Sequence, residues 1–221
     1  MAGSPNRDRK AERREATRRE ILAAAWEIAH ESGLTSVTLR EIAARIGMRP
    51  PSLYTHFASK NAIYDAMFAQ AWDEFHTVLE KAVPALPADP RGRLLAEASV
   101  YFDFAVGDLE RHQLMDMPML PDFTPSQEAF QSSLKCYAIM RSLLGEIGVH
   151  QQADLDLYTA LLGGLVNQQL ANDPKGDRWR VLLPRMVTLF ADDLGLPPSP
   201  PDNKAAAHLT DRETRGGTDE T

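Results

Sequence analysis

The segment TLREIAARIGMRPPSLYTHFASK, residues 38–60, restricts the fold of this chain more than any other stretch. Thr38 and Glu41 have the spacing of a capping box, and the apolar residues after them recur every three or four positions, as on the buried face of a short helix. Gly47 provides the backbone freedom that ends this helix. The Pro50–Pro51 pair is tolerated in a helix only in its first turn, so a second helix is predicted to begin there.

The second helix is predicted over residues 50–57, and its side chains are of two kinds. Leu53 and Phe57 are apolar anchors that hold it against its own module, whereas the residues between them are mostly polar. A helix, a turn that contains glycine and a short helix with a polar face form the helix-turn-helix pattern. The second helix of this pattern enters the major groove of DNA.

The formal net charge of −7 is unevenly distributed along the 221-residue chain. Residues 1–60 carry 11 Lys/Arg and 7 Asp/Glu, a net charge of +4, whereas residues 61–221 carry 13 and 24, a net charge of −11. The positive charge is therefore concentrated around the predicted helix-turn-helix, as neutralisation of phosphates requires. A difference of this size also arises by chance in charged surface helices, so it decides nothing alone.

Helical periodicity covers most of the remaining chain and no convincing strand pattern occurs. We expect an all-α fold with an N-terminal three-helix helix-turn-helix DNA-binding domain and a C-terminal helical ligand-binding and dimerisation domain. The predicted divisions are a flexible basic arm (1–15), the DNA-binding domain (16–60), the regulatory and dimerisation domain (61–195, with a linking helix over 61–83) and a disordered tail (196–221). The arm either reaches an adjacent minor groove or is merely solvated.

Capping signals mark the starts of several helices. Ser59 is the expected N-cap of the linking helix, and Asp89-Pro90 and Thr124-Pro125 each look like an N-cap followed by proline at the first helical position. Pro184 lies inside the last helix, predicted over 178–194, and is expected to kink it.

Residues 17–68 resemble the DNA-binding region of the TetR family of bacterial transcriptional regulators. The resemblance rests on ILAAAWEIAHESGLTSVTLREIAARIGM and on PSLYTHFASKNAIYDAMF, where the family typically shows S-x-L-Y-x-H-F-x-[SN]-K-x-x-L. Ile63 and Tyr64 stand where leucines are commoner, and the Pro50–Pro51 pair removes two backbone N–H groups at the entry to the second helix. The resemblance implies a helix-turn-helix protein that binds double-stranded DNA.

Side-chain chemistry and the resemblance together divide the expected DNA contacts into two groups. Tyr54, His56 and Lys60 are expected mainly on phosphates, which position a protein without reading sequence. The expected readers of base sequence are Arg40, Pro51, Ser52 and Thr55. Two alternatives remain open: Tyr54 as a half-buried core aromatic, and His56 as a cap of the second helix.

The resemblance also implies a two-fold dimer formed by the last two helices. Gly163–Gly164 lies in an apolar run and would let two helices approach closely. The expected interface residues are Leu161, Gly164, Leu165, Trp179, Leu183, Met186 and Phe190. Such a dimer places two recognition helices one DNA turn apart, roughly 34 Å, so the operator is expected to be an inverted repeat. The alternative is that these helices are ordinary monomer core.

A ligand pocket is expected in the central helices, where aromatic and methionine side chains gather. Methionine-rich surfaces adapt to varied apolar ligands. The expected lining residues are Tyr101, Phe104, Met115, Met119, Phe123, Phe130, Tyr137, Met140 and, as a hydrogen-bonding group, Gln168. Simple core packing is the alternative. The expected effector is a small apolar molecule whose identity the sequence does not define.

The sequence gives no sign of catalysis or of a metal or cofactor site. His112 and Asp116 stand four residues apart, but no third ligand has metal-site spacing. No nucleophile elbow, P-loop or dinucleotide fingerprint is present, and no segment has the character of a membrane span or signal peptide. The single cysteine, Cys136, is expected to be packed in the core, and a cytoplasmic location is the simplest setting.

We therefore expect a non-enzymatic, homodimeric transcriptional regulator, most simply a repressor that a small apolar ligand releases from its operator. An activator or a ligand-independent repressor fits the same pattern. The alternative from another class is a helical ligand-binding or enzymatic protein whose DNA-binding module no longer binds DNA. The acidic net charge supports that alternative, and the basic N-terminal region opposes it.

Overall fold

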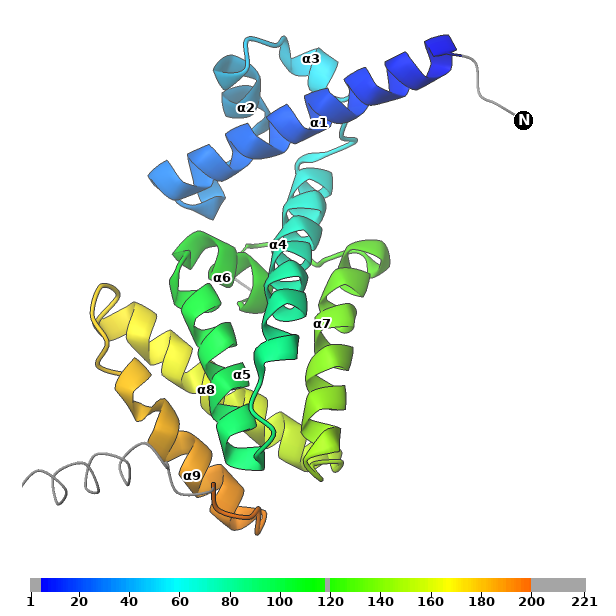
Figure 1. The fold of residues 1–221 in the computed structure, drawn as a ribbon. Helices are drawn as coiled ribbons and strands as arrows, with labels where there is room; N and C mark the ends of the chain where they lie inside the picture. Colours follow the sequence, from blue (N-terminus) through cyan, green and yellow to red (C-terminus); the bar gives the residue numbers. More distant parts are fainter. Residues whose placement is uncertain (1–4, 118–119, 200–221) are drawn as a thin grey trace, which may run out of the picture.

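The computed structural model describes residues 5–117 and 120–199, and every regular element in these ranges is a helix. The expected all-α fold is therefore confirmed. The helices form a small N-terminal module and a larger C-terminal body, and α4 extends from the first into the second (Figure 1). No helix in the described ranges is long and apolar enough to cross a membrane.

The N-terminal module is built around the inner face of its first helix. Its elements are α1 (Pro5–Ser32), the 3₁₀ turn η1 (Leu34–Ser36), α2 (Leu39–Arg45) and α3 (Pro50–Leu53). The buried residues of α1 are Ile21, Ala24, Ala25, Ile28 and Ala29. Leu53 and Phe57 pack into the same core, as their spacing predicts.

The C-terminal body has its own core. Its elements are α4 (Lys60–Ala82), η2 (Val83–Ala85), α5 (Pro90–Val106), α6 (Leu109–Asp116), α7 (Gln127–Glu146), α8 (Gln152–Asn172), η3 (Arg180–Leu182) and α9 (Leu183–Asp193). The α4 helix packs most extensively against α7, while α5 packs against both α8 and α9. The α8 and α9 helices lie side by side at one face of the body (Figure 1).

Side-chain caps begin several helices where the sequence predicts them. Thr38 Oγ1 accepts a hydrogen bond from the backbone N–H of Glu41, and Ser59 Oγ accepts one from Ala62. Asp89 caps α5 in the same way. The cap of α7 differs from the prediction, because Ser126 rather than Thr124 provides it. The helix therefore begins after the Thr124-Pro125 dipeptide and not within it.

The expected flexible arm is helical over residues 5–15, which form the first turns of α1. Residues 1–4 of the predicted arm lie outside the described residues. Arginine and glutamate make up six of the eleven residues of this segment, and Glu15 and Arg19 have the spacing that favours a helix. Intrinsic helix propensity therefore extends α1 although no apolar stripe is present.

Two other boundaries differ from the predictions. The second helix of the helix-turn-helix ends at Leu53 instead of residue 57, since the amides of Thr55 and His56 bond to carbonyls three residues back in tighter turns. Pro184 occupies the first turn of α9, where its missing N–H has no consequence, so it starts this helix instead of kinking it.

The beginning of the expected disordered tail packs against α5. The guanidinium of Arg91 donates to the carbonyls of Leu196 and Pro197, at 2.8 and 2.9 Å. Ser199 Oγ donates to Asp89 Oδ1 at 2.6 Å, and this hydrogen bond lowers the pKa of Asp89. Residues 200–221 of the predicted tail lie outside the described residues.

Candidate functional site

The predicted DNA-contacting residues form an exposed surface around α3. Five of them are exposed, namely Arg40, Pro51, Ser52, Tyr54 and Thr55, while His56 and Lys60 are half-buried. Tyr54 is 57% exposed, which excludes its alternative as a core aromatic. The apolar anchors on the other side of α3 are nearly inaccessible to solvent. We call these seven residues, together with Arg49, the α3 surface.

The hydroxyl groups of the α3 surface differ in their freedom to bind a base. Thr55 Oγ1 donates to the carbonyl of Ser52 at 2.7 Å. This bond occupies the only hydroxyl hydrogen of Thr55, so its methyl group and oxygen lone pairs remain for a base edge. The Ser52 hydroxyl has no hydrogen-bond partner within the described residues and is able to donate or accept.

Two arginines of α1 donate hydrogen bonds to backbone carbonyls at the end of the α3 surface. Arg18 Nη1 donates to the carbonyl of His56 at 2.5 Å, and its guanidinium lies 4.1 Å from the centre of the Phe57 ring. Arg14 Nη2 donates more weakly to the carbonyl of Thr55, at 3.4 Å. His56 Nδ1 is buried and has no hydrogen-bond partner within the described residues, so this nitrogen does not cap α3.

The structure adds Arg49, which our sequence analysis did not select. It is exposed and occupies the N-cap position of α3, immediately before Pro50. A guanidinium at this position is able to reach a phosphate or a guanine. The signal in the sequence was a basic residue between the glycine that ends α2 and the proline pair that begins α3.

The C-terminal body contains a cavity of about 610 Å³, and part of the predicted pocket lines it. The correctly predicted lining residues are Tyr101, Met115, Phe130, Tyr137 and Met140. Further walls come from α4 through Phe68, Trp72 and Phe75, and from α8 through Tyr158 and Asn167. Cys136 also lines the cavity; its side chain is buried, as expected, and burial raises the pKa of its thiol to about 12.

Three predicted pocket residues lie elsewhere. Phe104 packs on Phe75 with ring centres 4.9 Å apart, and Phe123 packs on Tyr64 in the N-terminal core. Gln168 is exposed and bonds to Asn172. On a helix, adjacent residues face different directions, so Asn167 reaches the cavity and Gln168 does not. Met119 lies outside the described residues.

The cavity contains polar groups that we did not predict as pocket residues. Glu97 is 4% exposed, and Tyr158 donates its hydroxyl to Glu97 Oε2. Burial raises the pKa of Glu97 to about 7, although the hydrogen bond from Tyr158 acts in the opposite direction. The sequence signal was one glutamate in the apolar run of α5.

A second polar group in the cavity centres on His112. Its Nε2 lies 2.9 Å from Asn167 Oδ1, and its Nδ1 lies 3.2 Å from Asp116 Oδ2. Burial opposes protonation of His112, but its contacts with Asp116 and Asn167 outweigh burial and raise its pKa. Tyr101 donates its hydroxyl to the same Asp116 oxygen at 2.8 Å. These groups offer a ligand both acceptors and donors.

The predicted dimer residues divide into two sets. Leu183, Met186 and Phe190 are at most 7% exposed and belong to the core of their own protomer, so the prediction that they form an interface surface is wrong. Leu165 and Trp179 are half-buried against the same core. Only Leu161 and Gly164 are exposed. A Cβ added to Gly164 would meet nothing within 4 Å, so this face of α8 is open.

Other apolar side chains on α8, η3 and α9 are also exposed. Leu157 is 43% exposed, Val181 59% and Leu189 61%. The periodicity of the last two helices did not identify these residues because it does not define which face of an apolar helix is covered. We call Leu157, Leu161, Gly164, Val181 and Leu189 the α8–α9 face.

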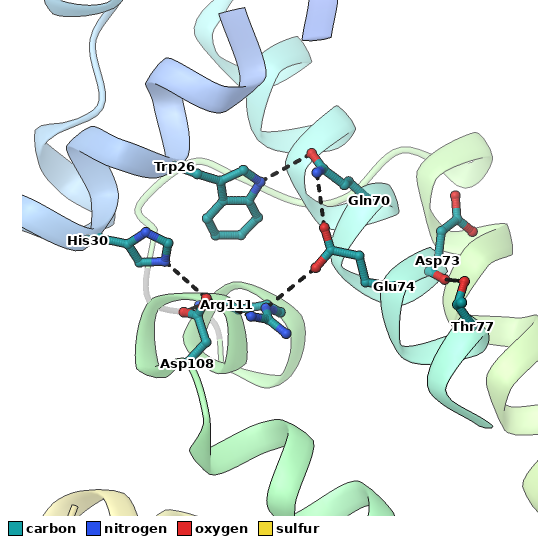
Figure 2. Close-up of polar contacts among 8 residues, drawn as sticks. All are labelled: Trp26, His30, Gln70, Asp73, Glu74, Thr77, Asp108 and Arg111. Carbon is teal, nitrogen blue, oxygen red and sulfur yellow. Dashed lines mark hydrogen bonds and ion pairs between the residues drawn. The ribbon is translucent and has the colours of Figure 1, made fainter. Parts of the chain in front are cut away.

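A network of polar contacts joins the N-terminal module to the body (Figure 2). Trp26 Nε1 donates to Gln70 Oε1 at 3.2 Å, and Gln70 donates onward to Glu74. His30 Nε2 lies 3.0 Å from Asp108 Oδ2, just before α6. We call these contacts, together with Arg111, the α1–α4–α6 junction.

Two carboxylates of this junction share one guanidinium. Arg111 Nη2 lies 2.9 Å from Asp108 Oδ2, and Arg111 Nε lies 3.8 Å from Glu74 Oε2. Although burial raises the pKa of Asp108, its hydrogen bonds with Arg111 outweigh this effect and lower it. Ligand atoms of His30, Asp108 and Glu110 lie within 4.8 Å of one another, but the cation that Asp108 contacts is Arg111.

A three-helix module with an exposed polar α3, joined by one long helix to a helical body with a cavity, defines the class of two-domain helix-turn-helix regulators. The family model for bacterial regulatory proteins of the tetR family matches residues 21–67. Residues 21–67 therefore form a DNA-binding region of the type found in the TetR family of regulators.

Two curated relatives each match less than half of this chain. The HTH-type transcriptional activator FasR of Mycolicibacterium smegmatis is 32% identical over 102 residues, which are 46% of this chain and 46% of FasR. The tetracycline repressor protein class A from transposon 1721 of Escherichia coli is 35% identical over 78 residues, 35% of each chain. The aligned region thus spans less than half the length of either relative.

Solved structures share most of the fold at lower identity. A protein with unknown function from Rhodococcus sp. RHA1 has a TM-score of 0.65 and 21% identity, covering 81% of this chain and 94% of that chain. The transcriptional regulator FadR from Bacillus subtilis, solved in complex with stearoyl-CoA, has a TM-score of 0.58 and 18% identity, covering 77% and 96%. At these identities the likeness shows the fold alone.

Proposed function

We propose that this protein is a sequence-specific DNA-binding transcriptional regulator, acting in the cytoplasm as a repressor that a ligand releases from an inverted-repeat operator. The observation that carries the proposal is the α3 surface, where short polar side chains and cations face solvent while Leu53 and Phe57 hold the helix in the core. The match of residues 21–67 to the tetR family supports the same role.

Within this proposal, phosphate and base contacts come from different parts of the α3 surface. Lys60 begins α4 just after its Ser59 cap, where the free N–H groups and the helix dipole favour a phosphate. Tyr54 and His56 also bind phosphate. Ser52 and Thr55, with Pro51 and the arginines at positions 40 and 49, read base edges.

The α8–α9 face forms the dimer interface in this proposal. Isolated apolar side chains are normal on protein surfaces, but here three leucines and a valine are exposed beside an open glycine. A two-fold interface pairs this face with its copy and sets two α3 surfaces roughly 34 Å apart on DNA. An inverted repeat presents matching half-sites at that spacing.

Ligand release operates through the α1–α4–α6 junction. Trp72 and Phe75 of α4 line the cavity, and Gln70 on the same helix bonds to Trp26 of α1. The α6 helix has the same double role, because His112 lines the cavity while Asp108 contacts α1. A ligand that prefers a shifted arrangement of α4 and α6 therefore changes the position of the DNA-binding module.

Selection of the purified protein against a randomised duplex library at physiological salt tests the proposal. An enriched inverted repeat, lost in an Arg40→Ala/Lys60→Ala double variant, is the expected result. The enriched duplex then serves to measure release by candidate ligands. Salt-sensitive retention without enrichment, both with and without a cell extract, would favour the alternative in which the module no longer recognises a DNA sequence.

The sign of regulation needs a separate measurement, because one curated relative is an activator and another is a repressor. A reporter gene placed behind the enriched duplex is expected to be silenced by the protein. Increased expression on adding the protein would make it an activator.

A further inference from the structure

The carboxyl group of Glu97 on α5 is only partly satisfied by the protein. It is 4% exposed and lines the cavity, and within the described residues Tyr158 is its only polar partner, through Oε2. Its second oxygen, Oε1, accepts no hydrogen bond there. Buried carboxylates are normally paired with a cation or with several donors. The protein therefore leaves one side of this carboxyl group for another partner.

The described residues offer Glu97 no Lys or Arg inside the cavity. His112 is the only basic group, and it already contacts Asp116 and Asn167. The charges of His112 and Asp116 cancel when both are ionised, so an ionised Glu97 makes the lining negative. A cationic ligand group would neutralise this charge.

The walls around these carboxyl groups are aromatic. Seven rings line the cavity: Phe68, Trp72, Phe75, Tyr101, Phe130, Tyr137 and Tyr158. Ring faces attract ammonium groups and also cover apolar ligand surface. Trp72 Nε1 is buried without a hydrogen-bond partner in the described residues, so a donor as well as an acceptor remains unsatisfied. A volume of about 610 Å³ suits a drug-sized molecule.

We propose that the cavity binds an amphipathic amine, with its protonated nitrogen beside Glu97 and its apolar body against the aromatic walls. This inference rests on the proposed function only in that it concerns the same effector cavity. It replaces the purely apolar effector expected from the sequence with one that carries a positive group. An acyl chain with a free carboxylate would instead bring a second negative charge to Glu97 without a cation to compensate it.

The burial of Glu97 supports a binding role for this residue. Since burial raises the pKa of this carboxyl group, its ionisation at neutral pH opposes folding. A glutamine or a leucine at position 97 would not ionise and would therefore not lower the stability of the folded state. Groups that lower stability in this way are typical of functional sites.

Three probes of equal chain length test the headgroup, namely decylamine, 1-decanol and decanoate, each titrated calorimetrically below its aggregation concentration at pH 8. Decylamine is expected to bind about tenfold more tightly than decanol, as a charge-assisted hydrogen bond at a buried site implies, and decanoate more weakly than both. Glu97→Gln should remove this preference for decylamine while changing the affinity for decanol less than about twofold. Glu80→Gln, at an exposed position on α4, is the matched control and should bind like the unaltered protein.

A pH series on the unaltered protein gives a second test that does not depend on the folding of a variant. Affinity for decylamine should fall as Glu97 is protonated below pH 7, while affinity for decanol changes little. The same cavity is lined by His112, Asp116, Tyr101, Cys136, Tyr137 and Tyr158, and contacts with Asp116 and Asn167 raise the pKa of His112. The part of the pH dependence that Glu97→Gln abolishes therefore belongs to Glu97.

Tighter binding of decanoate than of decylamine, equal binding of decylamine to the unaltered protein and to Glu97→Gln, or no binding of any probe would overturn the inference. These titrations contain no DNA. A protein that binds decylamine but enriches no duplex would therefore contradict the proposed function and leave this inference intact. A protein that enriches an inverted repeat but does not bind decylamine would support the proposed function and overturn this inference.

Discussion

His30 Nε2 at the end of α1 lies 3.0 Å from Asp108 Oδ2, the residue that caps α6 (Figure 2). The two residues are 78 positions apart in the sequence and belong to the DNA-binding module and the body respectively. This contact and the Trp26–Gln70 hydrogen bond hold α1 against the two helices that also line the cavity.

A double-mutant cycle with His30→Ala and Asp108→Asn measures this contact. Asparagine retains an oxygen for the α6 cap, so the cycle isolates the interaction with His30. We expect a coupling free energy of about 0.5 kcal/mol in urea unfolding, because the side chain of His30 is 46% exposed and solvent screens the pair. Coupling indistinguishable from zero at low salt would mean that the His30–Asp108 contact does not stabilise the junction.

Lys60→Ala and Thr55→Ala should have different effects on DNA binding. Removing Lys60 should weaken binding to all duplexes and lower the slope of log K against log salt by about one, since a phosphate contact is lost. Removing Thr55 should change which bases are preferred and leave the salt slope unchanged. Fluorescence anisotropy on two duplexes over a salt series checks both, and equal losses on every duplex for both variants would contradict this division.

The raised pKa of Glu97 should be detectable in the pH dependence of the free energy of unfolding. Its pKa rises on folding from an ordinary value of 4.5 to about 7, so between these values the folded state binds more protons than the unfolded state. Stability is therefore lost as pH rises through this window. Relative to the unaltered protein, Glu97→Gln should gain up to about 3 kcal/mol between pH 4.5 and 8, measured by urea unfolding. A constant difference across this range would show that Glu97 titrates normally.

Leu189→Glu should convert the proposed dimer into monomers. Leu189 is 61% exposed on α9, so the substitution leaves the protomer core intact but places a charge in the α8–α9 interface. Sedimentation velocity at micromolar concentration checks the mass. Val78→Glu on α4 is the control, because Val78 is similarly apolar and exposed but lies outside this face. Unchanged mass for Leu189→Glu would place any interface elsewhere.

Thr38→Ala should destabilise the DNA-binding module by about 1 kcal/mol, because the N-cap of α2 is lost. Thr35→Ala is the matched control, since Thr35 is exposed and no side-chain hydrogen bond of it is found in the described structure. Hydrogen exchange of the α2 amides reports the local effect. Equal protection in the two variants would show that packing, and not the cap, holds the start of this helix.

Local chemistry made the DNA-binding module predictable. Thr38 and Ser59 cap their helices through neighbours three residues away, and Gly47 ends α2 with a φ of 66°. Leu53 and Phe57 face the core because of their helical spacing. Each of these features depends on residues a few positions apart.

The chain's own sequence therefore determined the helices, most of their boundaries and the side of α3 that faces solvent. Only the tertiary structure decided which apolar faces are covered: it buried Leu183, Met186 and Phe190 within the protomer and left Leu189 exposed. It also placed Glu97 and His112, from separate helices, in one cavity. Helical periodicity is a property of neighbouring residues, whereas the partner of an apolar face and the contents of a cavity depend on how distant helices cross.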